Sequence, residues 1–165
     1  MTNTATASGT NITSIVSNQV SATLTGCGRM TGGSGQVQIT DDTFLTSGFT
    51  IHCDIVLSNN LEINWPNNKW HLSKPITYAR CIDDPAVTPG QPDAPFDTFV
   101  GRAVGELNGV AGSTVEFTFV DAGEPGKIAD KASILVKDKF GTTVLNISNV
   151  PIKGNLQAHE DQPHQ

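Results

Sequence analysis

The stretch VEFTFVDAGEPGK, residues 115–127, decides the fold class and raises the functional question. In its first half, Val115, Phe117 and Phe119 fall on one face of an extended chain, because successive side chains of a strand point to opposite faces. This alternation predicts a β-strand over 113–121 with one buried face. The second half combines carboxylates, glycines and a proline, a composition typical of a turn or of a loop that binds a metal.

Similar alternation recurs along the chain in short segments that are separated by turn residues. Further strands are predicted at 12–24, 37–40, 48–57, 61–65, 69–73, 76–82, 98–107, 132–138, 143–150 and 152–159. No segment shows the period of an amphipathic helix. About ten short, mainly antiparallel strands at this spacing predict an all-β chain with a single β-sandwich or jelly-roll-like domain.

The predicted organisation has three parts. Residues 1–25 form an N-terminal arm, 26–159 the β-sandwich domain, and 160–165 a polar tail. The proline-rich segment 83–95 is interpreted as a surface connection, because neither side of it holds enough strands for a sandwich. The glycine-rich segment 25–35 is interpreted as a turn region, since its glycines lack the spacing and the following helix of a phosphate loop.

Composition narrows the setting and the partners. Charged residues make up 16% of the chain and the formal net charge is −6, with ten Lys and Arg spread thinly, so nucleic acid is not an expected partner. No apolar run reaches the ~18 residues of a membrane helix, so no membrane span is expected. The N-terminal residues lack the features of a signal peptide, so a secreted form is expected to have lost its signal. The alternative is a cytosolic protein, which the glycine-, serine- and threonine-rich composition favours less.

Several phrases, in order, carry a family resemblance. They are GCGRMTGGSG (26–35), GFTIHCD (48–54), NNLEINW (59–65), WHLS (70–73), CIDDP (81–85), FDTFVGRAVGELNGVAGSTVEFTFVDAGEPGK (96–127) and VLNIS with GNLQAH (144–159). Together they resemble a module of bacterial secreted and surface proteins found beside choice-of-anchor domains. The resemblance implies secretion and a surface or matrix setting, and it implies no catalytic activity. The family reads DAGEPGKND and GNHQAH where this chain reads DAGEPGKIAD and GNLQAH, so a metal role is not carried over to those positions.

The acidic loop remains the best candidate for a metal. Asp121, Glu124 and Asp130 are hard oxygen donors within ten positions, and backbone carbonyls and water can complete the coordination that calcium requires. The spacing is not that of an EF-hand. The alternative is a plain turn, in which Asp121 bonds to its own backbone and Pro125-Gly126 bends the chain.

The three cysteines are Cys27, Cys53 and Cys81. Cys53 and Cys81 lie in strands that match the family phrases, and secreted β-domains commonly carry a disulfide, so a bond between these two is predicted. Closing this loop stabilises the fold by about 3.5 kcal/mol in the chain-entropy picture. Cys27 is then left over, either as a buried free thiol or as a bond to another chain.

The aromatic and histidine residues offer weaker candidates. Trp65 and Trp70, with Tyr78, are candidates for a platform on which a sugar ring stacks, and packing in the core is the alternative. His52 and His71 are interpreted as surface or hydrogen-bonded sheet residues. No constellation of acid, base and nucleophile stands out, so the chain is not predicted to be an enzyme.

The expected function is therefore that of a non-catalytic extracellular structural or interaction protein. We expect a subunit of a bacterial surface fibre or matrix, with copies of itself as partners. In this hypothesis the arm adds a strand to the sheet of a neighbouring copy, through Ile12, Ile15, Val20, Ala22 and Leu24. The alternative is a calcium- or carbohydrate-binding module of an exoprotein.

Overall fold

The computed structural model describes residues 2–3, 6–9, 12–16, 20–21, 28–40, 43–87, 94–123 and 130–160. These residues form strands, turns and bends and contain no helix, which confirms the all-β class. The same residues accordingly provide no helix with the length and hydropathy needed to cross a membrane.

Nine strands make one antiparallel sheet. They are β5 (Gly28–Thr40), β6 (Thr43–His52), β7 (Asn60–Trp65), β8 (Asn68–Leu72), β9 (Tyr78–Ile82), β10 (Thr98–Leu107), β11 (Val110–Val120), β12 (Lys131–Lys137) and β13 (Thr143–Glu160). Eight of them pair in the order β5-β6-β7-β8-β10-β11-β12-β13, and β13 pairs back with β5. The sheet therefore closes into a barrel, and β9 lies outside this circuit, paired with β10 beside β8.

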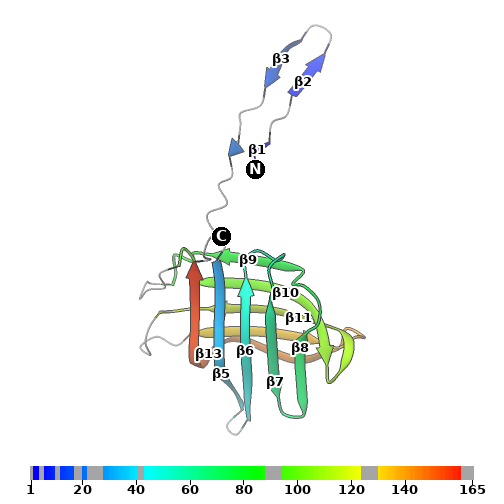
Figure 1. The fold of residues 1–165 in the computed structure, drawn as a ribbon, viewed down its shortest axis with the longest axis vertical. Coiled ribbons are helices and arrows are strands. Elements are labelled where there is room, and N and C mark those ends of the chain that lie inside the picture. The colour runs from blue at the N-terminus through cyan, green and yellow to red at the C-terminus, as the bar shows by residue number, and fades with distance from the viewer. Residues whose placement is uncertain are drawn as a thin grey trace.

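This closure differs from the predicted sandwich of two separate sheets. Figure 1 shows β13, β5, β6 and β7 running in front, with β9, β10 and β11 running across behind them. The two layers belong to one continuous sheet. They are joined on one side by the pairing of β8 with β10, and on the other by β13, which pairs first with β12 and then with β5.

The long strand β13 turns this corner at a bulge. Its pairing register with β5 shifts between Lys153 and Asn155, and Gly154 between them has a φ of 146°. A bulge bends a strand and increases its twist. One strand can therefore serve both layers of the barrel.

The interior of the barrel is filled by the inward-facing side chains of the alternating strands. Phe117 and Phe119 are buried, as the alternation predicted. Phe119 stacks on Phe49 with ring centroids 4.3 Å apart, and Phe117 stacks on Phe99 at 5.9 Å. Gly101 faces the Phe117 ring so closely that a Cβ there would lie 2.2 Å from it. The small residue in β10 is what makes room for the ring.

In the glycine-rich segment 25–35, predicted as a turn, the described residues 28–35 belong to the first strand of the barrel instead. Gly28 faces the Phe96 ring and Gly32 the Phe49 ring, and an added Cβ would lie 2.3 and 2.5 Å from those rings. These glycines admit large aromatic rings to the core and do not reverse the chain, which is a second use of glycine in strands.

Both predicted hairpins are present. Segments 61–65 and 69–73 form β7 and β8, and 132–138 and 143–150 lie in β12 and β13. The turn of the first hairpin places Asn67 at a φ of 61°, a left-handed conformation that asparagine tolerates better than most residues.

The N-terminal arm pairs with itself. β1 (Thr2–Asn3) pairs with β4 (Val20–Ser21), and β2 (Thr6–Gly9) pairs with β3 (Ile12–Val16). Among the described strands, none of these four pairs with the nine-stranded sheet. Ile12, Ile15 and Val20 of the predicted donor strand thus have partners within the arm, and Ala22 and Leu24 lie outside the described residues.

Candidate functional site

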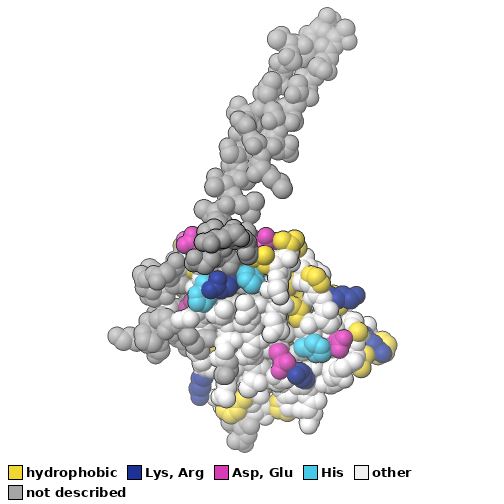
Figure 2. Space-filling view, viewed as in Figure 1, with side chains coloured by type: hydrophobic (Ala, Val, Ile, Leu, Met, Phe, Trp, Pro, Cys, Tyr) yellow, Lys and Arg dark blue, Asp and Glu magenta, His cyan; other side chains and the backbone are white. Residues whose placement is uncertain are grey.

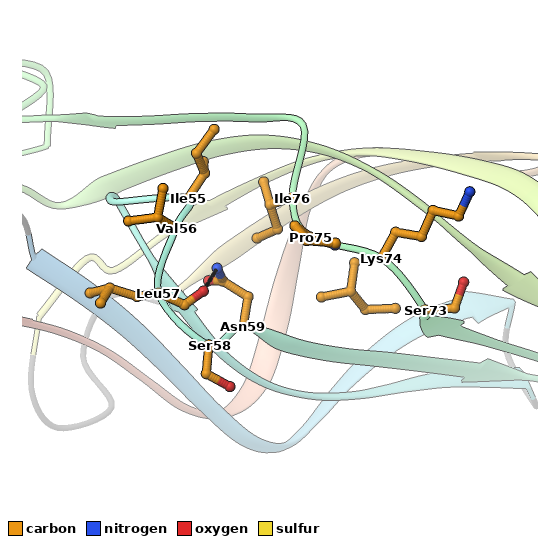
Figure 3. A pocket seen from close by; sticks show the side chains of 10 residues that line it. Ile55, Val56, Leu57, Ser58, Asn59, Ser73, Lys74, Pro75 and Ile76 are labelled. Carbon is orange, nitrogen blue, oxygen red and sulfur yellow. Dashed lines mark hydrogen bonds between the residues drawn. The ribbon is translucent and has the colours of Figure 1, made fainter.

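An open cleft of about 730 Å³ lies at one end of β6 and β7. One wall is the loop 53–59 between these strands, and the other is the connection 73–77 between β8 and β9. In Figure 3 the side chain of Ile76 extends from the connection toward the loop that carries Ile55 and Val56, and Lys74 extends outward at the other end. Apart from Leu72 at the end of β8, the lining residues come from these two loops, so the shape of the cleft depends on how the loops are held.

The cleft is apolar and open to solvent. Val56 is 84% exposed and Ile55 38% exposed, whereas Ile76 beside them is buried. Figure 2 shows hydrophobic side chains gathered at the upper end of the barrel, on a surface that is otherwise mostly uncharged and polar. Apolar side chains that are grouped and exposed in this way mark a contact surface more often than isolated ones do.

Hydrogen bonds fix the loop that carries the apolar side chains. The Asp54 carboxylate accepts the Val56 N–H at 3.1 Å, and the Asp54 carbonyl accepts the Leu57 N–H at 3.2 Å. The Asn59 side chain accepts the His52 N–H at 2.6 Å. This turn also ends β6 at His52, although the alternation predicted a strand as far as residue 57.

The predicted disulfide holds the first residue of the loop. Cys53 and Cys81 are bonded, with Cα atoms 5.8 Å apart, which confirms the predicted pair. The bond ties the start of the loop to β9. Cys27 lies outside the described residues.

The polar residues that line the cleft carry hydrogen-bonding groups. They are Ser58, Asn59, Ser73 and Lys74, and the described lining holds no carboxylate and no histidine. General acid–base catalysis requires a paired donor and acceptor of protons near the substrate. The cleft thus offers an apolar surface with a few hydrogen-bonding groups at its edge.

Two of the predicted calcium ligands are buried and bind backbone N–H groups. Asp121 accepts the N–H of Gly123 at 3.0 Å and that of Ala158 at 2.8 Å. Asp130 accepts the N–H of Ala122 at 3.0 Å and that of Leu156 at 3.2 Å. The carboxylates therefore join the DAGEPGK loop to the GNLQAH segment of β13.

This arrangement does not favour a shared calcium ion. Each N–H group occupies a lone pair of a carboxylate oxygen and places a partial positive charge beside it. A calcium ion would need those lone pairs to be open. In the part of the chain that the structure describes, no group of three or more His, Cys, Asp or Glu side chains is placed to hold a metal. Glu124 lies outside the described residues, so calcium binding by this loop stays a prediction.

A row of basic side chains crosses the outer face near the same end of the barrel. His159 of β13 pairs with Arg29 of β5, which pairs in turn with His52 of β6. Burial, followed by the positive charge of Arg29, lowers the pKa of His159, and Asp121 opposes this shift. The His159 Nε2 atom lies 2.9 Å from the Thr31 hydroxyl oxygen.

The tryptophans do not form an exposed platform for a sugar ring. Trp70 is wholly buried inside the barrel, and Trp65 is partly buried and packs against the core. Trp65 ends β7 beside the turn of the hairpin and Trp70 lies in the middle of β8, and the burial of Trp70 favours the alternative of core packing. Tyr78 on β9 is exposed, and Arg102 lies 5.5 Å from its ring centroid.

Comparison with family models, with curated proteins and with solved structures finds no match.

The sequence contains a signal for the apolar loop of the cleft, although the same residues also fit the pattern of a strand. Ile55 and Leu57 continue the alternation of β6, which led to their assignment to the strand. However, Asp54 and the run Ser58-Asn59-Asn60 are residues that favour turns. A short apolar group enclosed by turn residues predicts an exposed apolar loop.

Proposed function

We propose that this chain is a non-catalytic, secreted interaction module of a bacterial surface fibre or matrix, and that its apolar cleft binds a protein partner. One observation carries the proposal: Val56 and Ile55 stand exposed beside an open cleft, on a loop that hydrogen bonds and a disulfide hold in place. A fixed loop lowers the entropy lost when a partner binds.

The extracellular setting is supported by the disulfide. Disulfides form and persist in oxidising compartments and are rare in the cytosol. The sequence resemblance to modules found beside choice-of-anchor domains points to the same setting. A role in binding is supported by the lining of the cleft, whose described side chains offer no paired acid and base.

Assembly through the N-terminal arm is a further part of the proposal. Among the nine described strands of the large sheet, β9 is the strand that pairs on one edge alone. An open edge accepts a foreign strand through its backbone groups. The arm of a neighbouring copy would pair with this edge after its own β-pairs open.

A single substitution in the cleft tests its role. Val56→Asp places a charge on a side chain that is already 84% exposed, so the barrel is expected to keep its melting temperature. We expect sedimentation velocity to show weaker self-association than in the wild type, with S148D as a control for the added charge. Deleting residues 1–24 tests the arm separately. Self-association that neither change reduces would refute the proposed function.

A further inference from the structure

The barrel carries a second exposed apolar feature, the turn 138–142 between β12 and β13. Phe140 at its tip is 81% exposed and contributes nothing to the core. The Asp138 carboxylate accepts the N–H groups of Phe140 at 2.9 Å and of Thr142 at 2.8 Å. The Asp138 N–H donates to the Thr142 carbonyl at 2.9 Å. The ring therefore stands on a turn whose shape is already fixed.

An exposed aromatic ring on a fixed turn has the properties of an interface anchor. Aromatic residues are enriched among the residues that dominate binding energy, and a preordered turn loses little entropy on binding. Lys139 lies with its Nζ atom 5.0 Å from the centroid of the Phe140 ring. Val144, 37% exposed, extends the apolar surface beside the turn.

The geometry points to a second copy of this chain as the partner of the cleft, with the Phe140 turn of that copy inserted between Val56 and the connection 73–77. This inference rests on the proposed function, in which the cleft binds a protein partner. Self-association through the cleft is already part of that function, and the inference adds which segment of the second copy binds.

The cleft has room for the Phe140 turn, and both surfaces carry charged side chains. A phenylalanine ring buries roughly 150–250 Å², and an open cleft of about 730 Å³ has room for it and for the stem of a neighbouring side chain. Lys74 lines the cleft and Asp54 lies in its loop next to the lining residue Ile55, whereas the turn carries Asp138 and Lys139. Each surface therefore brings one charge of each sign, which orients the two copies as they meet.

The contact joins different surfaces of the two copies. A copy whose turn is bound still has a free cleft, and its partner still has a free turn. Such contacts continue into rings or open filaments when they are heterologous, and they close as a dimer when two copies exchange both turns. The inferred contact therefore supplies a route to a polymer that is independent of the N-terminal arm.

Two single variants of the full chain test the contact by sedimentation velocity over a range of concentrations. Phe140→Ser removes the ring, and Val56→Asp introduces a charge in the cleft. We expect each to weaken self-association by about 10- to 100-fold, the range that burial of one large apolar side chain gives. Phe44→Ser, which removes another exposed ring (40% exposed), and S148D are the matched controls and should associate as the wild type does.

Mixing the two variants gives the sharper result. The F140S copy keeps an intact cleft and the V56D copy an intact turn, so together they should form a 1:1 pair that the turn-to-cleft contact cannot extend. The F140S/V56D double variant, measured alone, gives the baseline for association through the arm. Failure of the two single variants to pair above this baseline would overturn the inference.

Other outcomes separate the inference from the proposed function. If V56D weakens association and F140S does not, another segment binds the cleft; the inference is then wrong and the proposed function stands. If neither weakens it, the inference is wrong, and deletion of residues 1–24 then decides whether the proposed function stands. If F140S instead abolishes binding to vesicles of phosphatidylcholine and phosphatidylserine and leaves self-association unchanged, the ring contacts a membrane surface and the inference is overturned.

Discussion

Replacing Asp121 by Asn tests whether the acidic loop is a structural clamp or a metal site. The substitution keeps the shape of the side chain and removes its charge. Asp121 accepts two backbone N–H groups, one within its own loop and one from Ala158 on β13. An amide has a single oxygen, so one of these donors would face an NH₂ group and lose its acceptor.

The expected cost follows from these two bonds. A hydrogen bond to a charged group contributes about 1.5–3 kcal/mol, and a buried N–H left without an acceptor costs about 1–3 kcal/mol. The lost hydrogen bond and the unpaired N–H group are partly the same loss, so the two values are not added. We expect the free energy of unfolding to fall by about 3 kcal/mol. For a domain of this size that is a fall of about 10 °C in melting temperature.

Thermal and urea unfolding, followed by circular dichroism, would measure the loss. D83N is a suitable control, because Asp83 is exposed and its substitution should change stability by less than about 0.5 kcal/mol. The measurement is made once with EDTA and once with calcium. If Asp121 is a structural clamp, D121N loses the same stability in EDTA as in calcium. If the difference between wild type and D121N disappeared in EDTA, Asp121 would be a metal ligand and our reasoning would be wrong.

Three further predictions follow from other contacts. Replacing both cysteines of the Cys53–Cys81 bond by alanine should lower stability by about 3.5 kcal/mol, and an unchanged urea midpoint would contradict this. Gly101→Ala should cost about 1–3 kcal/mol by pressing on the Phe117 ring, whereas Gly33→Ala, with no atom within 4 Å of the added carbon, should leave the melting temperature nearly unchanged. Because the pKa of His159 is lowered in the folded state from 6.5, its contribution to stability is present above that pH and lost as the pH falls through the folded pKa. Stability curves against pH should therefore be flatter between pH 7 and 5 in H159Q than in the wild type, and parallel curves would refute the assignment.

The sequence supports predictions that depend on local pattern. The alternation of residues 113–121 identified β11 and its inward-facing rings, and the two hairpins follow from apolar segments separated by turn residues. The disulfide was predicted from two cysteines in strands and from the common use of such bonds in secreted domains. In each case neighbours in sequence, or a general chemical rule, carry the information.

The remainder depends on residues that are distant in sequence. The glycines of β5 resemble turn residues until the rings of Phe49 and Phe96 are placed over them. Asp121 resembles a metal ligand until Ala158, 37 positions later, supplies an N–H group to it. Closure of the sheet into a barrel depends on the pairing of β13 with β5, which no local pattern of residues encodes.

The closed sheet also has a consequence for how this module can be rearranged and combined with others. Gly28 at the start of β5 pairs with Glu160 at the end of β13, so the barrel begins and ends at neighbouring positions. Domains whose ends meet tolerate circular permutation and insertion into loops of other proteins. A short linker from Glu160 to Gly28, with new termini at the exposed Asn108-Gly109 turn, should preserve the whole pairing circuit. The same geometry lets a host protein carry this barrel as an insert without separating the two ends of its own loop.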